Sequence, residues 1–209
     1  RPDGTKVKKY YLTFSPGGYY SIYYPVTAAV ADDPLGPYVK LDEDEGQPIV
    51  TINNDMGEKI SGTGIGSFVE ANGETYVFYH RHKDYGKPEP RTIAVDRVLW
   101  RYYPELGYEV PHCNGPTSTL QPNPATADGY RNVAAEAKAE ATNGANSAEY
   151  LNDGYVAIHD RDENIIFRTQ GGKTTITLTF AEEKEIRAIA IYNDRNIDYA
   201  FGKVDYILF

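Results

Sequence analysis

Two histidines, His80 and His82, stand one residue apart at the end of the aromatic segment 76–81. Alternate side chains of a strand share a face, so both imidazoles could bind one transition metal if a third ligand came from elsewhere. The sequence shows no obvious third ligand. A polar pair at the end of a strand is more often the rim of a pocket or plain surface, and we favour that interpretation.

Tyrosine is the compositional outlier, with 19 copies against one tryptophan and seven phenylalanines. A tyrosine ring can pack against the C–H face of a sugar while its hydroxyl reaches sugar hydroxyls or water. Tyrosine also favours strands, so most of these side chains are expected in a β-sheet core. The cluster Tyr19, Tyr20, Tyr23 and Tyr24 is different, because adjacent aromatic residues on opposite faces of a strand cannot all be buried. We expect Tyr19 to contact a ligand.

The net charge of −9 argues against nucleic acid as a partner. Binding to phosphates needs clustered Lys and Arg, and no basic run here is longer than Lys8-Lys9. No apolar stretch approaches the roughly 20 residues that span a bilayer, so we expect no membrane partner. The acidic run 42–46 lacks the distal glutamate of an EF-hand and predicts a solvated loop rather than a calcium site.

The elements that position these residues are predicted to be strands of a repeated β unit. The segment 76–81, with the alternating segment 91–100 after it, echoes the segment 10–15 and the strand near Val26 at a spacing of about 65 residues. Each copy predicts a turn, an aromatic strand, a loop and a second strand, a pattern typical of propeller blades. Two copies cannot close a ring.

The second half of the chain differs in composition, and we place the boundary near Pro124. Residues 1–124 hold most of the Pro, Tyr and His, and residues 125–209 are Ala-rich and then β-branched. In the second part, the segment 174–180 alternates Thr outward with Ile, Leu and Phe inward. The apolar run 186–192 predicts a strand that is covered on both faces. This order favours a β-sandwich.

Residues 1–124 resemble the C-terminal part of the catalytic domain of glycoside hydrolase family 43, a five-bladed propeller that cleaves xylose- and arabinose-containing glycans with inversion. The resemblance rests on four motifs in the order of the family. They are Tyr10-Tyr11-Leu12-Thr13-Phe14-Ser15 with Gly17-Gly18-Tyr19, Ala29-Val30-Ala31 with Pro34-Leu35-Gly36-Pro37-Tyr38, Ser61 to Val69, and Gly115-Pro116-Thr117 with Leu120-Gln121-Pro122.

The chain departs from the family at two points. The family's "T-G-H-G-S-F-V" strand has a His that helps to hold a central metal ion, and Ile65 stands there in this chain. An aliphatic side chain cannot ligate a hard cation, so we expect no His-held metal in the propeller and place Ile65 beside the substrate. The general acid and general base that the resemblance implies match no position here. We expect them upstream of residue 1, and we expect this chain alone to be inactive.

The resemblance also implies a role for Arg91, which aligns with an Arg that opens the family's "G-R-x-x-x-x-x-R-x-x-W" strand and projects towards the substrate pocket. A guanidinium beside a sugar donates hydrogen bonds to its hydroxyls. Pro90 replaces the preceding Gly of the motif, so the loop differs. The alternative is that Arg91 is a solvated charge at the start of a strand.

Residues 125–209 resemble the first part of a discoidin or coagulation factor 5/8 type C domain, a β-sandwich found in many carbohydrate-binding modules. The resemblance implies a structural calcium loop, with Asp153 as the candidate ligand and backbone carbonyls completing the shell. An Asx turn without metal is the alternative for Asp153.

The sequence therefore predicts an all-β chain, a partial five-bladed β-propeller followed by a partial, jelly-roll-like β-sandwich. We expect part of a secreted or periplasmic glycoside hydrolase, with a plant cell-wall polysaccharide and the missing propeller blades of the same polypeptide as its partners. The localisation follows from the family, since the chain carries no targeting signal. A non-catalytic glycan-binding or scaffolding protein on the same propeller is the alternative, motivated by Ile65 and by the missing carboxylates.

Overall fold

The computed structural model describes residues 4–41, 50, 59–71, 73–113, 115–118, 120–121, 131–154, 166–192 and 202–208. The acidic run 42–46 and the predicted boundary at Pro124 lie outside these residues. The strands of the described residues pair in antiparallel sheets, which confirms the all-β class. The chain separates into two compact units, residues 1–129 and 130–209. Among the residues with described structure, none forms a helix long and apolar enough to cross a membrane.

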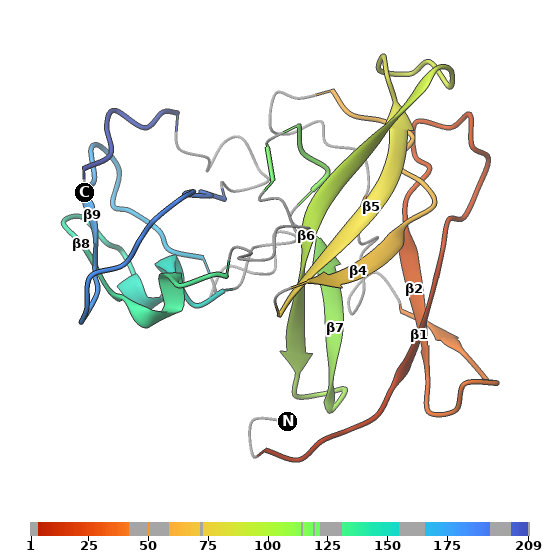
Figure 1. The fold of residues 1–209 in the computed structure, drawn as a ribbon, viewed down its shortest axis with the longest axis horizontal. Helices are drawn as coiled ribbons and strands as arrows, with labels where there is room; N and C mark the ends of the chain where they lie inside the picture. Colours follow the sequence, from red (N-terminus) through yellow and green to blue (C-terminus); the bar gives the residue numbers. More distant parts are fainter. Residues whose placement is uncertain are drawn as a thin grey trace. The chain divides into compact units, whose positions relative to one another are not determined.

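The described residues of the first unit form two sheets (Figure 1). The first sheet has the order β1-β2-β3 and the second the order β4-β5-β6-β7. A four-stranded antiparallel sheet with sequential neighbours is the form of one propeller blade. The strands are β1 (Tyr10–Phe14), β2 (Thr27–Ala31), β3 (Val39–Lys40), β4 (Ser67–Ala71), β5 (Glu74–His82), β6 (Arg91–Tyr103) and β7 (Tyr108–Cys113).

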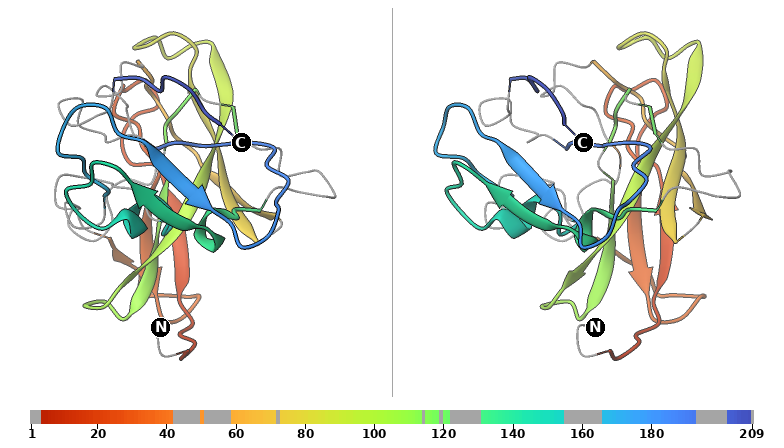
Figure 2. Two further views of the ribbon diagram at one scale, coloured as in Figure 1. Left: turned by 90° about the vertical axis from the view of Figure 1, so that its left-hand side faces the viewer. Right: turned by 60° about the vertical axis from the view of Figure 1, so that its left-hand side comes forward.

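The predicted repeat corresponds to two similar strand pairs. The segment that begins at Tyr10 pairs with β2, and the segment around Tyr76 pairs with β6, each in antiparallel register. Strands β5 and β6 run side by side and twist along their length, as the views in Figure 1 and Figure 2 show. Twisted strands of this kind are the normal result of L-amino-acid geometry.

The core of the first unit lies between its two sheets. Strand β2 is buried along its whole length, because it lies between β1 and β3 and its small side chains admit close neighbours. Its residues Ala28 and Val30 pack with Val77 and Tyr79 of β5. Cys113 is buried in this cluster, and its Sγ accepts the Gly115 N–H at 3.3 Å.

A buried carboxylate on β6, Asp96, ties this sheet to the segment that follows it. Asp96 is 0% exposed and accepts hydrogen bonds from the Tyr79 hydroxyl at 2.6 Å, from the Thr117 hydroxyl at 2.6 Å and backbone N–H at 3.1 Å, and from the Gln121 amide at 3.1 Å. Burial and the Asp96 charge raise the pKa of Tyr79 far above its ordinary value, so this phenol stays a donor. Gly115 is required because a Cβ there would lie 2.3 Å from Asp96 Oδ2.

One predicted strand of the first unit is irregular. The segment 61–69 was expected to be a single strand, but regular pairing begins only at Ser67. Gly62 has φ of +64° and Ile65 has φ of +54°, and both values interrupt an extended backbone. The segment still follows β5, because the N–H groups of His80 and His82 bind the carbonyls of Gly64 and Ser61.

The second unit contains one short ladder in its described part. Strand β8 (Lys138–Ala141) pairs with β9 (Ile176–Thr179), and two 3₁₀ turns, η1 (Ala134–Glu136) and η2 (Ala148–Leu151), accompany it. The predicted strand at 174–180 is therefore confirmed in its central part. Its predicted burial is wrong, because Ile176 is 50% and Leu178 is 40% exposed. A two-stranded ladder offers no second layer to cover such side chains.

The predicted strand at 186–192 is wrong, since these residues form no strand. Ile189 and Ile191 are 47% and 52% exposed instead of covered on both faces. Apolar β-branched composition favours a strand only where a neighbouring backbone completes the ladder. In the described ranges of this unit, the paired strands are β8 and β9. The β-sandwich stays a prediction.

Candidate functional site

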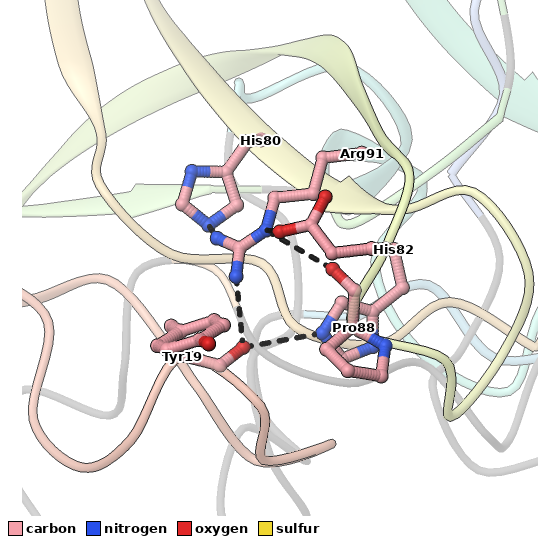
Figure 3. Close-up of polar contacts among 6 residues, drawn as sticks. Tyr19, His80, His82, Pro88 and Arg91 are labelled. Carbon is pink, nitrogen blue, oxygen red and sulfur yellow. Dashed lines mark hydrogen bonds and ion pairs between the residues drawn. The ribbon is translucent and has the colours of Figure 1, made fainter.

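The candidate site lies at the end of the second sheet where β5 leads into β6. Arg91 is the first residue of β6 and stands opposite His82, the last residue of β5, in the ladder. The connecting loop is closed by a hydrogen bond from the Lys83 N–H to the Pro90 carbonyl at 3.0 Å. Both predicted site residues from this region, Arg91 and Tyr19, meet here (Figure 3).

The Arg91 guanidinium is held by three hydrogen-bond acceptors, by an ion pair between its Nε and Glu89 Oε1 at 3.5 Å, and by one aromatic ring (Figure 3). Its Nε donates to the Pro88 carbonyl at 3.2 Å, its Nη1 to His80 Nε2 at 2.5 Å and its Nη2 to the Tyr19 carbonyl at 3.3 Å. Its Cζ lies 4.8 Å from the centroid of the Tyr19 ring, within cation–π distance. In the part of the chain that the structure describes, these bonds use three of the five guanidinium N–H groups and leave two for a ligand.

The contact with Arg91 fixes the protonation state and the tautomer of His80. A guanidinium can only donate, so His80 Nε2 is the acceptor and the neutral ring carries its proton on Nδ1. Burial and the neighbouring Arg91 charge lower the pKa of His80 below its ordinary value of 6.5. The Tyr24 ring stacks on His80, with centroids 5.8 Å apart. A Cβ at Gly64 would lie 2.0 Å from the Tyr24 ring, so glycine makes room for this stack.

A second group of side chains anchors the Tyr19 backbone. The buried His82 ring donates from Nε2 to the Tyr19 carbonyl at 3.3 Å, and its Nδ1 lies 3.0 Å from the Ser61 hydroxyl. Ser61 Oγ in turn accepts the Gly86 N–H at 2.9 Å. Thus the Tyr19 carbonyl accepts from both His82 and Arg91. The role of Ser61 was not predicted, because a serine in an irregular segment gives no signal of such a contact. The prediction of a rim or surface position is wrong for His82, since its side chain is buried.

The tyrosine cluster is exposed around this anchor, as its spacing predicts. Tyr19, Tyr20 and Tyr23 are 54%, 68% and 64% exposed. The rings of Tyr19 and Tyr20 meet edge to face at 5.7 Å, and the Arg91 guanidinium covers part of Tyr19. The site therefore combines a fixed cation with exposed aromatic faces, an arrangement suited to an amphipathic, hydroxyl-rich ligand.

Ile65 lies beside this site on the neighbouring segment. It follows Gly64, whose carbonyl accepts the His80 N–H at 3.2 Å, and its own N–H donates to Ser15 Oγ at 2.8 Å. Its side chain is 63% exposed and its φ is +54°, a conformation that is unfavourable for a β-branched residue. Strained residues of this kind are often found at binding sites. Contact of Ile65 with a substrate stays a prediction.

The structure gives information on the metal sites considered at the histidine pair, at Asp153 and at Ile65. His82 uses both ring nitrogens and His80 its Nε2 in hydrogen bonds, which engages the atoms that a metal would need. Asp153 lies exposed in the turn after η2 and before Gly154. Within the described ranges, no three His, Cys, Asp or Glu side chains gather as metal ligands. A calcium ion at Asp153 and the lack of a His-held metal at Ile65 stay predictions.

The second arginine of the predicted strand motif serves the sheet rather than the site. Arg97 Nε bonds Glu74 Oε2 at 2.5 Å, and both side chains are less than 20% exposed. Trp100 Nε1 donates to Thr75 Oγ1 at 3.0 Å. These contacts hold the far end of β6 against β5, away from Arg91.

A pH titration tests whether the His80 ring is held in its neutral form. We expect the ring signals of His80 in NMR to titrate with a pKa below 6.5, and Arg91→Ala to raise that pKa part of the way, since burial remains. Because the folded pKa is lowered, the free energy of unfolding should be highest above the unfolded pKa of about 6.5 and should fall as the pH drops below it. Titration of His80 at 6.5 or above would contradict the hydrogen bond from Arg91.

No protein-family model matches this chain, and no curated protein matches it either.

Solved structures that are similar to this chain are glycoside hydrolases. The crystal structure of a thermostable family-43 glycoside hydrolase is 32% identical, with a TM-score of 0.47 over 58% of this chain and 36% of that one. An endo-1,4-beta-xylanase from Bacteroides thetaiotaomicron is 26% identical, with a TM-score of 0.43 over 53% and 35% of the two chains. A xylan beta-1,4-xylosidase from Bacillus halodurans is 28% identical, with a TM-score of 0.41 over 52% and 20%. This chain therefore spans between 20% and 36% of the length of these three enzymes.

Proposed function

We propose that this chain is part of a glycoside hydrolase that acts on xylose- and arabinose-containing plant polysaccharides by inverting hydrolysis of O-glycosidic bonds. Its first unit supplies a sugar-binding part of a propeller, and its second unit is an accessory sandwich. The proposal takes the protein to be secreted or periplasmic, where such polysaccharides occur, and takes Asp153 as a ligand of a structural calcium ion.

The observation that carries the proposal is the fixed Arg91 guanidinium against the exposed Tyr19 ring. Three hydrogen-bond acceptors hold the guanidinium, and its ring partner belongs to the tyrosine cluster, for which we predict contact with a ligand. The two remaining N–H groups can donate to adjacent sugar hydroxyls. The exposed faces of Tyr20 and Tyr23 can pack against the C–H face of the next ring. A guanidinium held in advance loses little entropy when the sugar binds.

Hydrolysis needs groups beyond this site. Inverting enzymes use two carboxyl groups, roughly 6.5–9.5 Å apart, one as general acid and one as general base for a water molecule. We assign neither role to a residue of this chain, and the proposal takes the chain alone to be inactive. The role of Arg91 is then to bind and orient the sugar ring for groups that belong to other parts of the protein.

Arg91→Ala tests the proposal at the site itself. We expect xylotriose to shift the ring signals of His80 in NMR and Arg91→Ala to weaken this binding about 10- to 100-fold, the effect of losing one or two charge-assisted hydrogen bonds. Arg97→Ala is the matched control, since it removes the same charge from the same strand but bonds Glu74. The proposal fails if Arg91→Ala binds xylotriose as wild type does, or if Arg97→Ala loses binding to the same extent.

A non-catalytic glycan-binding protein is the second candidate function, and Ile65 favours it. The resembling strand has a metal-supporting His where this chain has an exposed aliphatic residue at φ +54°. A protein that carries this chain together with its preceding blades separates the two functions. Release of aryl alcohol from an aryl α-L-arabinofuranoside or β-D-xyloside supports the hydrolase. Retained xylotriose binding without release supports the binding protein.

A further inference from the structure

A second aromatic groove lies in the first unit at the opposite end of β6 from Arg91. Its volume is about 860 Å³, within the range of pockets that hold small molecules, about 300–1,000 Å³. Arg91 begins β6 and Trp100 lies nine residues further along the same strand, a separation of about 30 Å in an extended chain. The groove is therefore separate from the candidate site. Four aromatic side chains line it, namely Tyr11, Trp100, Tyr102 and Tyr108.

Hydrogen bonds and a ring contact fix the orientation of two of these aromatic side chains, Trp100 and Tyr11. Trp100 is held by its bond to Thr75 and by an edge-to-face contact with Tyr11, with ring centroids 5.2 Å apart. The Tyr11 hydroxyl donates to the Glu109 carbonyl. Burial raises the pKa of Tyr11 well above its ordinary value, which keeps this donor protonated. A lining that is oriented in advance is suited to recognition, because little entropy is lost on binding.

The charges of the lining favour a neutral ligand. Lys6 and Lys9 line the groove together with Glu70 and Glu109, so neither sign dominates. Lys9 is already bound to Asp32 at 2.5 Å, and its ammonium lies 4.8 Å from the centroid of the Tyr108 ring. Flat apolar faces among balanced polar groups match a molecule with C–H faces and hydroxyls on its edges. A volume of about 860 Å³ suits a short chain of rings better than a single one.

We propose that this groove is a second glycan-binding site that holds a short neutral oligosaccharide against Trp100 and Tyr102. It binds independently of Arg91, so a polysaccharide can be held at both ends of the sheet. Two linked contacts with one polymer raise its overall affinity well above that of either contact alone.

The single tryptophan of the chain makes this proposal testable without interference from the first site. Trp100 is the only tryptophan in the sequence, so its fluorescence reports on the groove alone. We expect xylohexaose to change this fluorescence in a saturable way, with the same midpoint in wild type and in Arg91→Ala. Tyr102→Ala should weaken the binding at least tenfold, and Tyr102→Phe, which keeps the ring, should retain it within about twofold.

The results that overturn the second site differ from those that overturn the proposed function. An unchanged Trp100 signal, or a signal that Arg91→Ala abolishes, overturns the groove proposal even where His80 still reports xylotriose binding. The same affinity in Tyr102→Ala and wild type also overturns it. A second measurement uses the wild-type chain alone, so it tests the groove even where Tyr102→Ala fails to fold. We expect xylohexaose to protect Trp100 of the wild-type chain from oxidation by N-bromosuccinimide, and equal oxidation with and without the sugar overturns the proposal.

Discussion

Asp96→Ala should lower the free energy of unfolding of the first unit by about 3 kcal/mol or more, the largest effect that we expect from any single side chain here. The substitution leaves the buried Tyr79 hydroxyl and the Thr117 N–H without the acceptor that both now share. Each buried donor without a partner costs about 1–3 kcal/mol. Urea unfolding, followed by the fluorescence of Trp100 in the same sheet, measures the loss.

Asp96→Asn is the matched control for this prediction. The amide oxygen can keep the bonds from Tyr79 and the Thr117 N–H, while its NH₂ group donates to the Thr117 hydroxyl and to the Gln121 amide oxygen after that amide turns over. We therefore expect Asp96→Asn to lose clearly less stability than Asp96→Ala. If both variants unfold at the wild-type urea concentration, the carboxylate does not hold the segment 115–121 to the sheet.

Gly62→Ala should be the most damaging small substitution at the candidate site. A Cβ at this position would lie 2.2 Å from His82 Nε2, and the ring cannot retreat easily because it is buried. The backbone has φ of +64°, which costs an L-residue about 1–2 kcal/mol, and forcing atoms into a packed site adds about 1–3 kcal/mol. We expect a total loss of about 3 kcal/mol in the free energy of unfolding, measured by urea unfolding.

Gly73→Ala separates the two causes of that loss. Gly73 has φ of +78°, and a Cβ there would meet no atom within 4 Å. Its substitution should therefore cost only the backbone component, about 1–2 kcal/mol. In Gly62→Ala the ring signals of His82 should also move, because the contact with the Tyr19 carbonyl is lost. Equal losses in the two glycine variants would show that His82 is not pressed against Gly62.

The regular strands of the first unit were predictable because their residues satisfy local rules. Aromatic and β-branched side chains with turn residues between them predict β1, β2, β5 and β6, and the structure has all four. The strand at 186–192 could not be excluded in this way. Its composition favours a strand, and only the absence of a paired neighbour among the described residues shows that it is not one.

The candidate site was predictable in its side chains but not in its anchor. Arg91 and Tyr19 were expected at one site, and the structure joins them through the Tyr19 carbonyl. A backbone acceptor carries no residue-specific signal, so the roles of Ser61 and His82 were invisible in the sequence. The buried Asp96 could not be singled out either, because it stands next to Arg97 in the segment 91–100, and the sequence does not say which charged side chain is buried.

Because Tyr19 is anchored through its backbone, the side chains around it can be changed without moving the chain. Arg91 and His82 hold the carbonyl of residue 19, a group that every amino acid possesses. The path of the loop around Tyr19 thus depends on two side chains of the sheet. The exposed rings of Tyr20 and Tyr23 do not hold the loop in place. Residues 19, 20 and 23 form a surface that can be randomised in a library to select for new ligands, with the loop kept in place by the unaltered β5 and β6.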